Sequence, residues 1–211
     1  MDAYLKTLIS RGENKKVDFK YCINDSKKIA RTLSAFANTE GGTLLVGVRD
    51  NGSIAGVNSE EEYYMIDSAA KLYCKPEIPV VMKPHDVNRK TIIEVKVEKG
   101  LNRPYKAKGE DGKWRAYFRN DDQNLVANRI LIKLWKYDMR KKGIMIRFGK
   151  SENILLNYLK ENNSITLSAF RKLAEIPLYR AEKIIVNLLL ADVLIMDASE
   201  KGYKYRLNCT E

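Results

Sequence analysis

Between residues 17 and 48 the spacing of apolar residues changes from that of a strand to that of a helix and back to that of a strand. Apolar residues first alternate with polar ones, which predicts a half-buried strand with Asp18 and Lys20 together on its polar face. Helical spacing follows between Ser26 and the Gly41-Gly42 pair, residue types that begin and end helices. The continuous apolar run at 43–48 then predicts a buried central strand. This succession restricts the segment to folds in which helices cover a sheet.

Turn residues and alternating segments extend the predicted sheet. Asp50-Asn51-Gly52 predicts a tight turn that joins the 43–48 strand to a second strand at Ser53–Val57. A helix is expected from about Glu60 to Tyr73, and further strands are expected at 79–82, 91–97 and 113–119. Together these segments predict an α+β domain with a mixed sheet over residues 1–127.

A long basic helix is predicted next, from Asp121 to about Lys142, because acidic residues stand at its start and basic residues at its end. Basic residues recur along one side of this helix at spacings of four, three and four, namely Arg129, Lys133, Lys136 and Arg140. These cations form either a solvated helix face or a face that follows the phosphates of a nucleic acid. We assign residues 128–149 to this basic linking helix and its linker.

The segment 150–211 predicts a small helical domain. Helical patterns cover about 151–161, 166–173 and 177–191, and two short strands follow at 193–197 and 203–207. Three helices before a two-stranded ribbon is the order of a winged helix, a relative of the helix-turn-helix. The third helix leaves Arg180, Lys183 and Asn187 on a polar stripe beside Tyr179, and this stripe could enter a major groove of DNA. Winged helices also dock proteins or form dimers, so a homodimer is the alternative role.

The charge of the chain favours a polyanionic partner. Lys and Arg number 38 against 27 Asp and Glu, a net charge of +11. Residues 1–149 carry 29 basic and 19 acidic side chains, whereas residues 150–211 carry 9 and 8. Such an excess suits DNA or RNA, and an anionic membrane surface is the competing partner. Because no apolar stretch reaches the roughly 20 residues of a membrane span, we expect a cytoplasmic protein without a membrane partner.

Cysteine, histidine and glycine usage argues against several kinds of site. Cys22, Cys74 and Cys209 show no CxxC spacing, which argues against a zinc site or a disulfide framework. His85 is the only histidine and falls in an apparent loop, where we expect it to be solvated. The glycines of 42–47 lead into a strand rather than a helix, so a phosphate-binding P-loop for ATP is not expected.

Short motifs carry a resemblance to a known family. They are Glu13 with VDFK at 17–20, SAFANTEGG at 34–42, LLVGVRDNG at 44–52, IAGV at 54–57, Arg103-Pro104-Tyr105 and Tyr117-Phe118-Arg119. Their order resembles the AlbA_2 or Schlafen-type domain over about residues 5–127. The resemblance implies a mixed α+β nucleic-acid-binding domain, to which bacterial members frequently append a winged helix. Within SAFANTEGG, we expect Asn38 and Thr39 to bond backbone rather than phosphate.

The Schlafen branch of that family implies a catalytic site. Members of this branch are metal-dependent endoribonucleases with three catalytic carboxylates. The resemblance implies that Glu13, Asp18 and Asp50 occupy the matching positions in this chain, with Lys20 close by. The carboxylates would hold Mg²⁺ or Mn²⁺, and Lys20 would stabilise charge on the attacked phosphate. In the structural alternative, Glu13 and Lys20 are solvated, Asp18 lies on a polar strand face and Asp50 lies in a turn. The chain also departs from the family at Asp121, where glycine is frequent.

These patterns lead to three functional hypotheses. The first is a nucleic-acid-binding protein of the transcriptional-regulator type. Its contacts would come from Arg119, Arg129, Lys133, Lys136, Arg140, Tyr179, Arg180 and Lys183. The second is a metal-dependent endoribonuclease built on Glu13, Asp18, Lys20 and Asp50. The third is a dimerisation or assembly module in the C-terminal domain.

Overall fold

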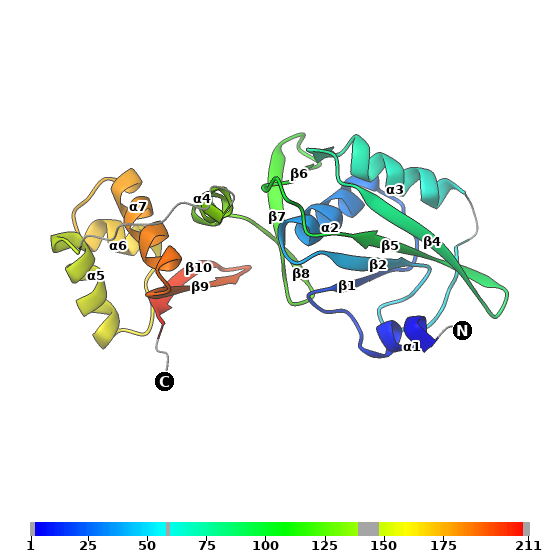
Figure 1. Cartoon of the computed structure of the whole chain (residues 1–211), viewed down its shortest axis with the longest axis horizontal. Helices are drawn as coiled ribbons and strands as arrows, with labels where there is room; N and C mark the ends of the chain where they lie inside the picture. The colour runs from blue at the N-terminus through cyan, green and yellow to red at the C-terminus, as the bar shows by residue number, and fades with distance from the viewer. Residues whose placement is uncertain (1–2, 58–59, 139–147, 209–211) are drawn as a thin grey trace. The chain divides into compact units, whose positions relative to one another are not determined.

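The chain folds into two compact units, one of residues 1–127 and one of residues 128–211 (Figure 1). The computed structural model describes residues 3–57, 60–138 and 148–208. The mixed α+β class is confirmed, and the basic helix expected between two domains groups with the second unit. None of the described helices is long and apolar enough to cross a membrane.

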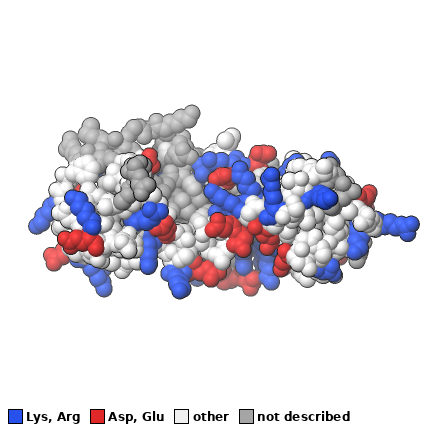
Figure 2. Space-filling model, turned by 90° about the horizontal axis from the view of Figure 1, so that it is seen from below, with Lys and Arg blue, Asp and Glu red and all other residues white. Residues whose placement is uncertain are grey.

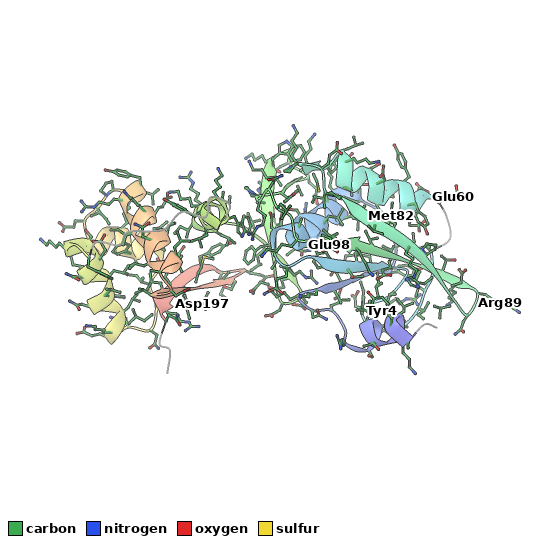
Figure 3. The ribbon with its side chains drawn as sticks, in the orientation of Figure 1. Tyr4, Glu60, Met82, Arg89, Glu98 and Asp197 are labelled. Carbon is green, nitrogen blue, oxygen red and sulfur yellow. The ribbon has the colours of Figure 1, made fainter. Side chains whose placement is uncertain are left out.

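The first unit contains two sheets. The first sheet has the order β1-β2-β5-β4, built from β1 (Val17–Lys20), β2 (Gly42–Val46), β5 (Lys90–Val97) and β4 (Val80–Val87). β1 and β2 run parallel, with Asp18 opposite Leu44, and the other pairs are antiparallel. β4 and β5 form a hairpin whose tip carries Arg89, labelled in Figure 3. β4 therefore lies at one edge of this sheet.

The second sheet is antiparallel and has the order β3-β6-β7-β8. It consists of β3 (Cys74–Lys75), β6 (Lys106–Lys108), β7 (Trp114–Asn120) and β8 (Gln123–Val126). Asp121 and Asp122 form the turn between β7 and β8, and Asp121 has a φ of 51°. A left-handed φ is the conformation that glycine adopts most readily, which fits the glycine expected there in related chains.

Helix α2 (Ser26–Asn38) is the centre of the first unit. It packs on strands of both sheets and on α3 (Glu61–Lys71), and its residues from Leu33 to Asn38 are all buried. Helix α1 (Ala3–Ser10) covers the other face of the first sheet, where Leu5 packs with Phe19 and Leu45 (Figure 1). The central strand β2 is thus covered on both faces, as its continuous apolar run predicts.

Polar side chains of α2 bond the backbone of the second sheet. The buried Asn38 side chain donates to the carbonyls of Tyr105 and Tyr117 at 2.7 and 2.8 Å and accepts the Tyr105 N–H at 2.8 Å. The Thr39 hydroxyl donates to the Ala35 carbonyl and accepts the Arg119 N–H at 2.9 Å. The expected backbone role of Asn38 and Thr39 is confirmed.

Two of the expected elements are shortened in the structure. The strand predicted at 53–57 is reduced to isolated bridges of Ile54 with Val48 and of Val57 with Thr91, since β1 and β5 occupy both edges of β2. The helix predicted from Asp121 begins only at Arg129, because Asp121 and Asp122 turn the chain into β8. Acidic residues favour turns as well as helix starts, so the charge pattern alone did not separate the two.

The second unit has the expected order of helices and strands. It contains α4 (Arg129–Asp138), α5 (Lys150–Glu161), α6 (Leu167–Leu173), α7 (Leu178–Leu190), β9 (Leu194–Ser199) and β10 (Gly202–Leu207). β9 and β10 form an antiparallel hairpin, and the core gathers Leu155, Phe170 and Ile185 from three helices. Ile130 of α4 belongs to the same core, which anchors α4 in this unit.

Asn128 fixes the start of α4. Its Oδ1 accepts the Leu131 N–H at 2.8 Å, the usual N-cap bond. Its backbone N–H and its Nδ2 donate to the hydroxyls of Tyr203 and Tyr205 on β10, both at 3.2 Å. Burial raises the pKa of both tyrosines to about 12. The tyrosines therefore stay neutral acceptors over the physiological pH range.

Replacing Asn38 with Ala is expected to destabilise the first unit by about 3 kcal/mol, because three hydrogen bonds of about 1 kcal/mol each are lost and their buried backbone partners stay unsatisfied. Urea denaturation followed by circular dichroism measures the loss. Asn162→Ala, which removes an exposed bond to the Tyr158 carbonyl, is the control and should change stability far less. Equal effects of the two substitutions would contradict the buried role of Asn38.

Candidate functional site

The centre of the expected catalytic cluster is a buried ion pair. Asp18 of β1 is 3% exposed and Arg119 of β7 is 2% exposed. Arg119 Nη2 lies 3.1 Å from Asp18 Oδ1 and also donates to the Val17 carbonyl, while Nε donates to the Asn14 carbonyl. The guanidinium lies 5.4 Å from the centre of the Phe36 ring. The pair thus joins the first sheet to the second inside the unit.

A closed ring of hydrogen bonds surrounds this pair. Arg119 Nη1 donates to Asn124 Oδ1 at 3.0 Å, and Asn124 Nδ2 donates to the Thr32 hydroxyl at 2.9 Å. Thr32 in turn donates to Asp18 Oδ2 at 3.3 Å. Thr32 could have been found in the sequence, because it lies three residues after Ile29 on the buried face of its helix. No local signal marks Asn124.

Glu13 and Lys20 extend the cluster toward solvent. Lys20 Nζ lies 3.0 Å from Asp18 Oδ2 and 4.0 Å from Glu13 Oε1, so Asp18 and Lys20 do share one face of β1 as predicted. Glu13 Oε1 also accepts the Phe19 N–H at 2.8 Å. Burial, with the neighbouring Asp18 carboxylate, raises the pKa of Glu13 despite that bond and the Lys20 charge. The cluster pairs its carboxylates with cations of the protein itself.

The structure does not gather the three expected metal ligands. Asp50 is exposed in a turn, in which the Gly52 N–H donates to the Arg49 carbonyl at 2.8 Å. Among the residues that the structure describes, no group of three or more His, Cys, Asp or Glu side chains could hold a metal ion. Both oxygens of Asp18 already bond Arg119, Lys20 or Thr32. Glu13, Asp18 and Asp50 therefore do not fit Mg²⁺ or Mn²⁺, which require several oxygen ligands free to converge on the ion.

Arg119 is also placed where it cannot reach a phosphate. Its side chain is 1% exposed, and every one of its guanidinium nitrogens donates inward. A phosphate contact would require the Asp18 pair to open and leave a buried carboxylate uncompensated. The Arg119 guanidinium is therefore not available to contact nucleic acid in this structure.

The other expected contact residues meet in the second unit. A groove of about 340 Å³ lies between α4 and α7, and we call it the α4–α7 groove. Its lining residues are Lys133, Lys136 and Tyr137 of α4 and Tyr179, Lys183, Val186 and Asn187 of α7. Two stripes predicted separately, one on the basic helix and one on the third helix of the C-terminal domain, thus form the walls of one groove.

The groove carries a net positive charge. Lys133 forms an ion pair with the buried Glu182 of α7, which holds α4 against α7. Neither Lys136 nor Lys183 pairs with an acidic side chain within residues 3–57, 60–138 and 148–208. Two ammonium groups are therefore available to an anion in the groove.

The remaining expected contacts lie at or beyond the rim. Arg129 and Arg180 are exposed on α4 and α7 but do not line the groove. Arg140 lies outside the described residues. The basic stripe of α4 thus divides into Lys133 and Lys136 inside the groove and Arg129 outside it.

Assigning α4 to the second unit changes where the charge excess lies. Residues 128–211 carry 16 basic and 9 acidic side chains, a net charge of +7, whereas residues 1–127 carry 22 and 18, a net charge of +4. The excess expected in the N-terminal domain therefore belongs mostly to the second unit. Basic and acidic side chains are interspersed on the face shown in Figure 2.

His85 is not solvated in a loop as expected. It lies on β4 with its side chain 9% exposed, and its Nε2 is 2.8 Å from Glu94 Oε2 on β5. Tyr4 of α1, labelled in Figure 3, donates to Glu94 Oε1 at 2.8 Å, and Lys96 Nζ lies 3.4 Å from the same carboxylate. Burial alone would raise the pKa of Glu94, but these partners together hold its pKa below the usual value. The cluster secures α1 to the first sheet.

Comparison with known proteins finds a family and several solved structures. A family model described as Schlafen, AlbA_2 matches residues 13–128, more than half of the chain. No curated protein matches the chain.

Two of the matching solved structures are distantly similar to this chain. The DIP2311 protein from Corynebacterium diphtheriae is 19% identical with a TM-score of 0.43, and the match covers 67% of this chain and 33% of that one. The chain thus spans about a third of the length of DIP2311. The N-terminal domain of a RecG-related protein from Nitrosomonas europaea is 21% identical with a TM-score of 0.41, and the match covers 61% of this chain and 97% of that domain.

Replacing Arg119 with Met is expected to destabilise the first unit by about 3–5 kcal/mol, because one partner of a buried ion pair is removed and Asp18 is left behind. Arg115→Met is the matched control on the same strand, since Arg115 pairs with Asp111 at the surface and surface pairs contribute little. Chemical denaturation measures both. Loss of nucleic-acid binding by Arg119→Met at unchanged stability would contradict the buried role.

The contribution of Glu94 to stability is expected to depend on pH. Because the folded pKa of Glu94 is depressed, its contribution is present above the unfolded pKa of about 4.3 and is lost as the pH falls through the folded pKa. The difference in unfolding free energy between wild type and Glu94→Gln should therefore shrink as the pH is lowered from 7 to 3 in urea denaturation. The exposed Glu98→Gln is the control. A pH-independent difference would show that the charge of Glu94 is not what its partners stabilise.

Proposed function

The chain belongs to the Schlafen AlbA_2 family, and from this premise we propose that it is a nucleic-acid-binding protein that holds phosphates in the α4–α7 groove. The observation that carries the proposal is the meeting of Lys133, Lys136 and Lys183 in one groove. Phosphate contacts by lysine supply most of the sequence-independent affinity for nucleic acid.

The charge distribution supports this location. The second unit carries +7, and its groove holds two lysines that are not paired with an acid among the described residues. In the first unit, by contrast, two cations of the family motifs are paired internally, Arg119 with Asp18 and Lys20 with Asp18 and Glu13. The first unit then serves as the scaffold of the protein, and the second as its contact surface.

The order of elements in the second unit supports a winged-helix assignment. Helices α5, α6 and α7 precede the β9–β10 hairpin, which is the order of a winged helix. Tyr179, Arg180 and Lys183 lie exposed on α7. We propose on this basis a regulator-type protein with domains at residues 1–127 and 128–211, in which the basic helix α4 belongs to the second domain.

The geometry does not favour the nuclease hypothesis. Hydrolysis by the expected carboxylates requires them to bind a metal ion, and the oxygens of Asp18 are taken by Arg119, Lys20 and Thr32. Among the described residues no other acidic group of three replaces them. We therefore propose binding without a metal-dependent step.

Binding of labelled oligonucleotides is expected to weaken with salt. Each phosphate contact contributes a slope of about −0.7 to −0.9 to log K against log salt concentration. The variant Lys136→Gln/Lys183→Gln should therefore bind more weakly and with a slope that is shallower by roughly 1.4 to 1.8. Fluorescence anisotropy at several salt concentrations measures both quantities.

The matched control is Lys160→Gln/Lys204→Gln, which removes the same charge from exposed positions of the second unit outside the groove. It should keep the wild-type slope. Equal effects of the two double variants would show that net charge, rather than the groove, attracts the nucleic acid. Absence of binding by the wild type at low salt would refute the proposal.

A further inference from the structure

We propose that the α4–α7 groove selects single-stranded nucleic acid and stacks its bases on Tyr137 and Tyr179. This inference rests on the proposed function, and it adds the form of nucleic acid and the groups that recognise it.

The width of the site favours a single strand over a duplex. An α-helix with its side chains is about 10–12 Å across, and packed helices lie about 8–10 Å apart. The two helices that line the groove therefore present a surface about 20 Å wide, whereas the major groove of DNA is about 12 Å wide and admits one helix. Because α4 lies against α7 and is held there by the Lys133–Glu182 pair, the groove-lining edge of α7 cannot enter a duplex. A strand that enters the protein groove meets no such obstacle.

The two tyrosines of the groove also favour a single strand. Tyr179 is 71% exposed and Tyr137 is 37% exposed, and neither belongs to the core of the second unit. The rings come from opposite walls of the groove, Tyr137 from α4 and Tyr179 from α7. An exposed aromatic face beside lysines is the arrangement with which proteins bind single strands, because unpaired bases stack on the ring while the cations contact the backbone. In a duplex, the faces of the bases are already stacked on one another.

The volume of the groove and its other lining groups fit a nucleotide. A volume of about 340 Å³ falls at the small end of the range of ligand sites, roughly 300–1,000 Å³, and suits an extruded nucleotide rather than a helix. The Asn187 amide can donate to or accept from the edge of a base. Lys136 and Lys183 remain for the adjacent phosphates. The groove thus supplies groups for the base and for the phosphates of a nucleotide.

The test compares strands and duplexes on the full chain. Oligothymidylate and oligouridylate are compared with DNA and RNA duplexes of equal length by fluorescence anisotropy at one salt concentration. We expect each single strand to bind at least about tenfold more tightly than its duplex. Loss of one stacked base costs about 1–3 kcal/mol, so Tyr179→Ala should weaken single-strand binding about 5- to 150-fold. Tyr179→Phe, which keeps the ring, should bind within about twofold of the wild type.

Tyr137→Ala and Tyr137→Phe form the second matched pair, and thermal unfolding checks that all variants fold. Photocrosslinking with bromouracil strands gives a positive readout, since the crosslinked peptides should contain Tyr137 or Tyr179. Equal or tighter binding of duplexes, or tyrosine variants that bind normally, would overturn the single-strand inference. If Lys136→Gln/Lys183→Gln still weakens binding in that case, the proposed function survives; if no nucleic acid binds at all, both fail.

Discussion

The first unit depends on one buried ion pair between residues far apart in the sequence. Asp18 on β1 and Arg119 on β7 are each almost fully buried, and the pair connects two sheets that share no strand. An isolated charge in such a place is costly, so each partner requires the other and the surrounding hydrogen bonds. Thr32 and Asn124 supply side-chain hydrogen bonds around the pair. The motifs that resemble the Schlafen family therefore meet in space because they build a polar core. The same hydrogen bonds and ion pairs occupy both carboxylate oxygens of Asp18.

Local periodicity was sufficient for much of the fold. The strand at 17–20, the helix at 26–38 and the buried strand that follows were all predicted, because each has a distinct spacing of apolar residues. The order of helices and strands after residue 150 was predicted for the same reason. The turn at Asp121 was not, since acidic residues before a helical pattern are compatible with either a helix start or a turn. The strand predicted at 53–57 does not form, because β5 pairs with the edge of β2 that this strand would have used.

The candidate sites were less accessible to sequence reasoning. Arginine is usually exposed, and only a partner 101 residues away makes Arg119 a buried residue. His85 likewise depends on Glu94 across a hairpin and on Tyr4 from the first helix. The two walls of the α4–α7 groove were each recognised as polar stripes, but helical spacing within one helix cannot reveal which other helix lies beside it. The assignment of α4 to the second unit, and with it the location of the positive charge, required the tertiary structure.

The position of β4 at the edge of the first sheet affects how the protein behaves at high concentration. Among the described strands, β4 pairs only with β5, which leaves its other side open to a strand from another molecule. Val81 is 66% exposed on this strand and would favour such pairing. Pro84 lacks the N–H that an added strand would need, and the exposed Lys83 places a charge beside it. These two residues therefore disfavour the extension of this sheet by a strand of another molecule.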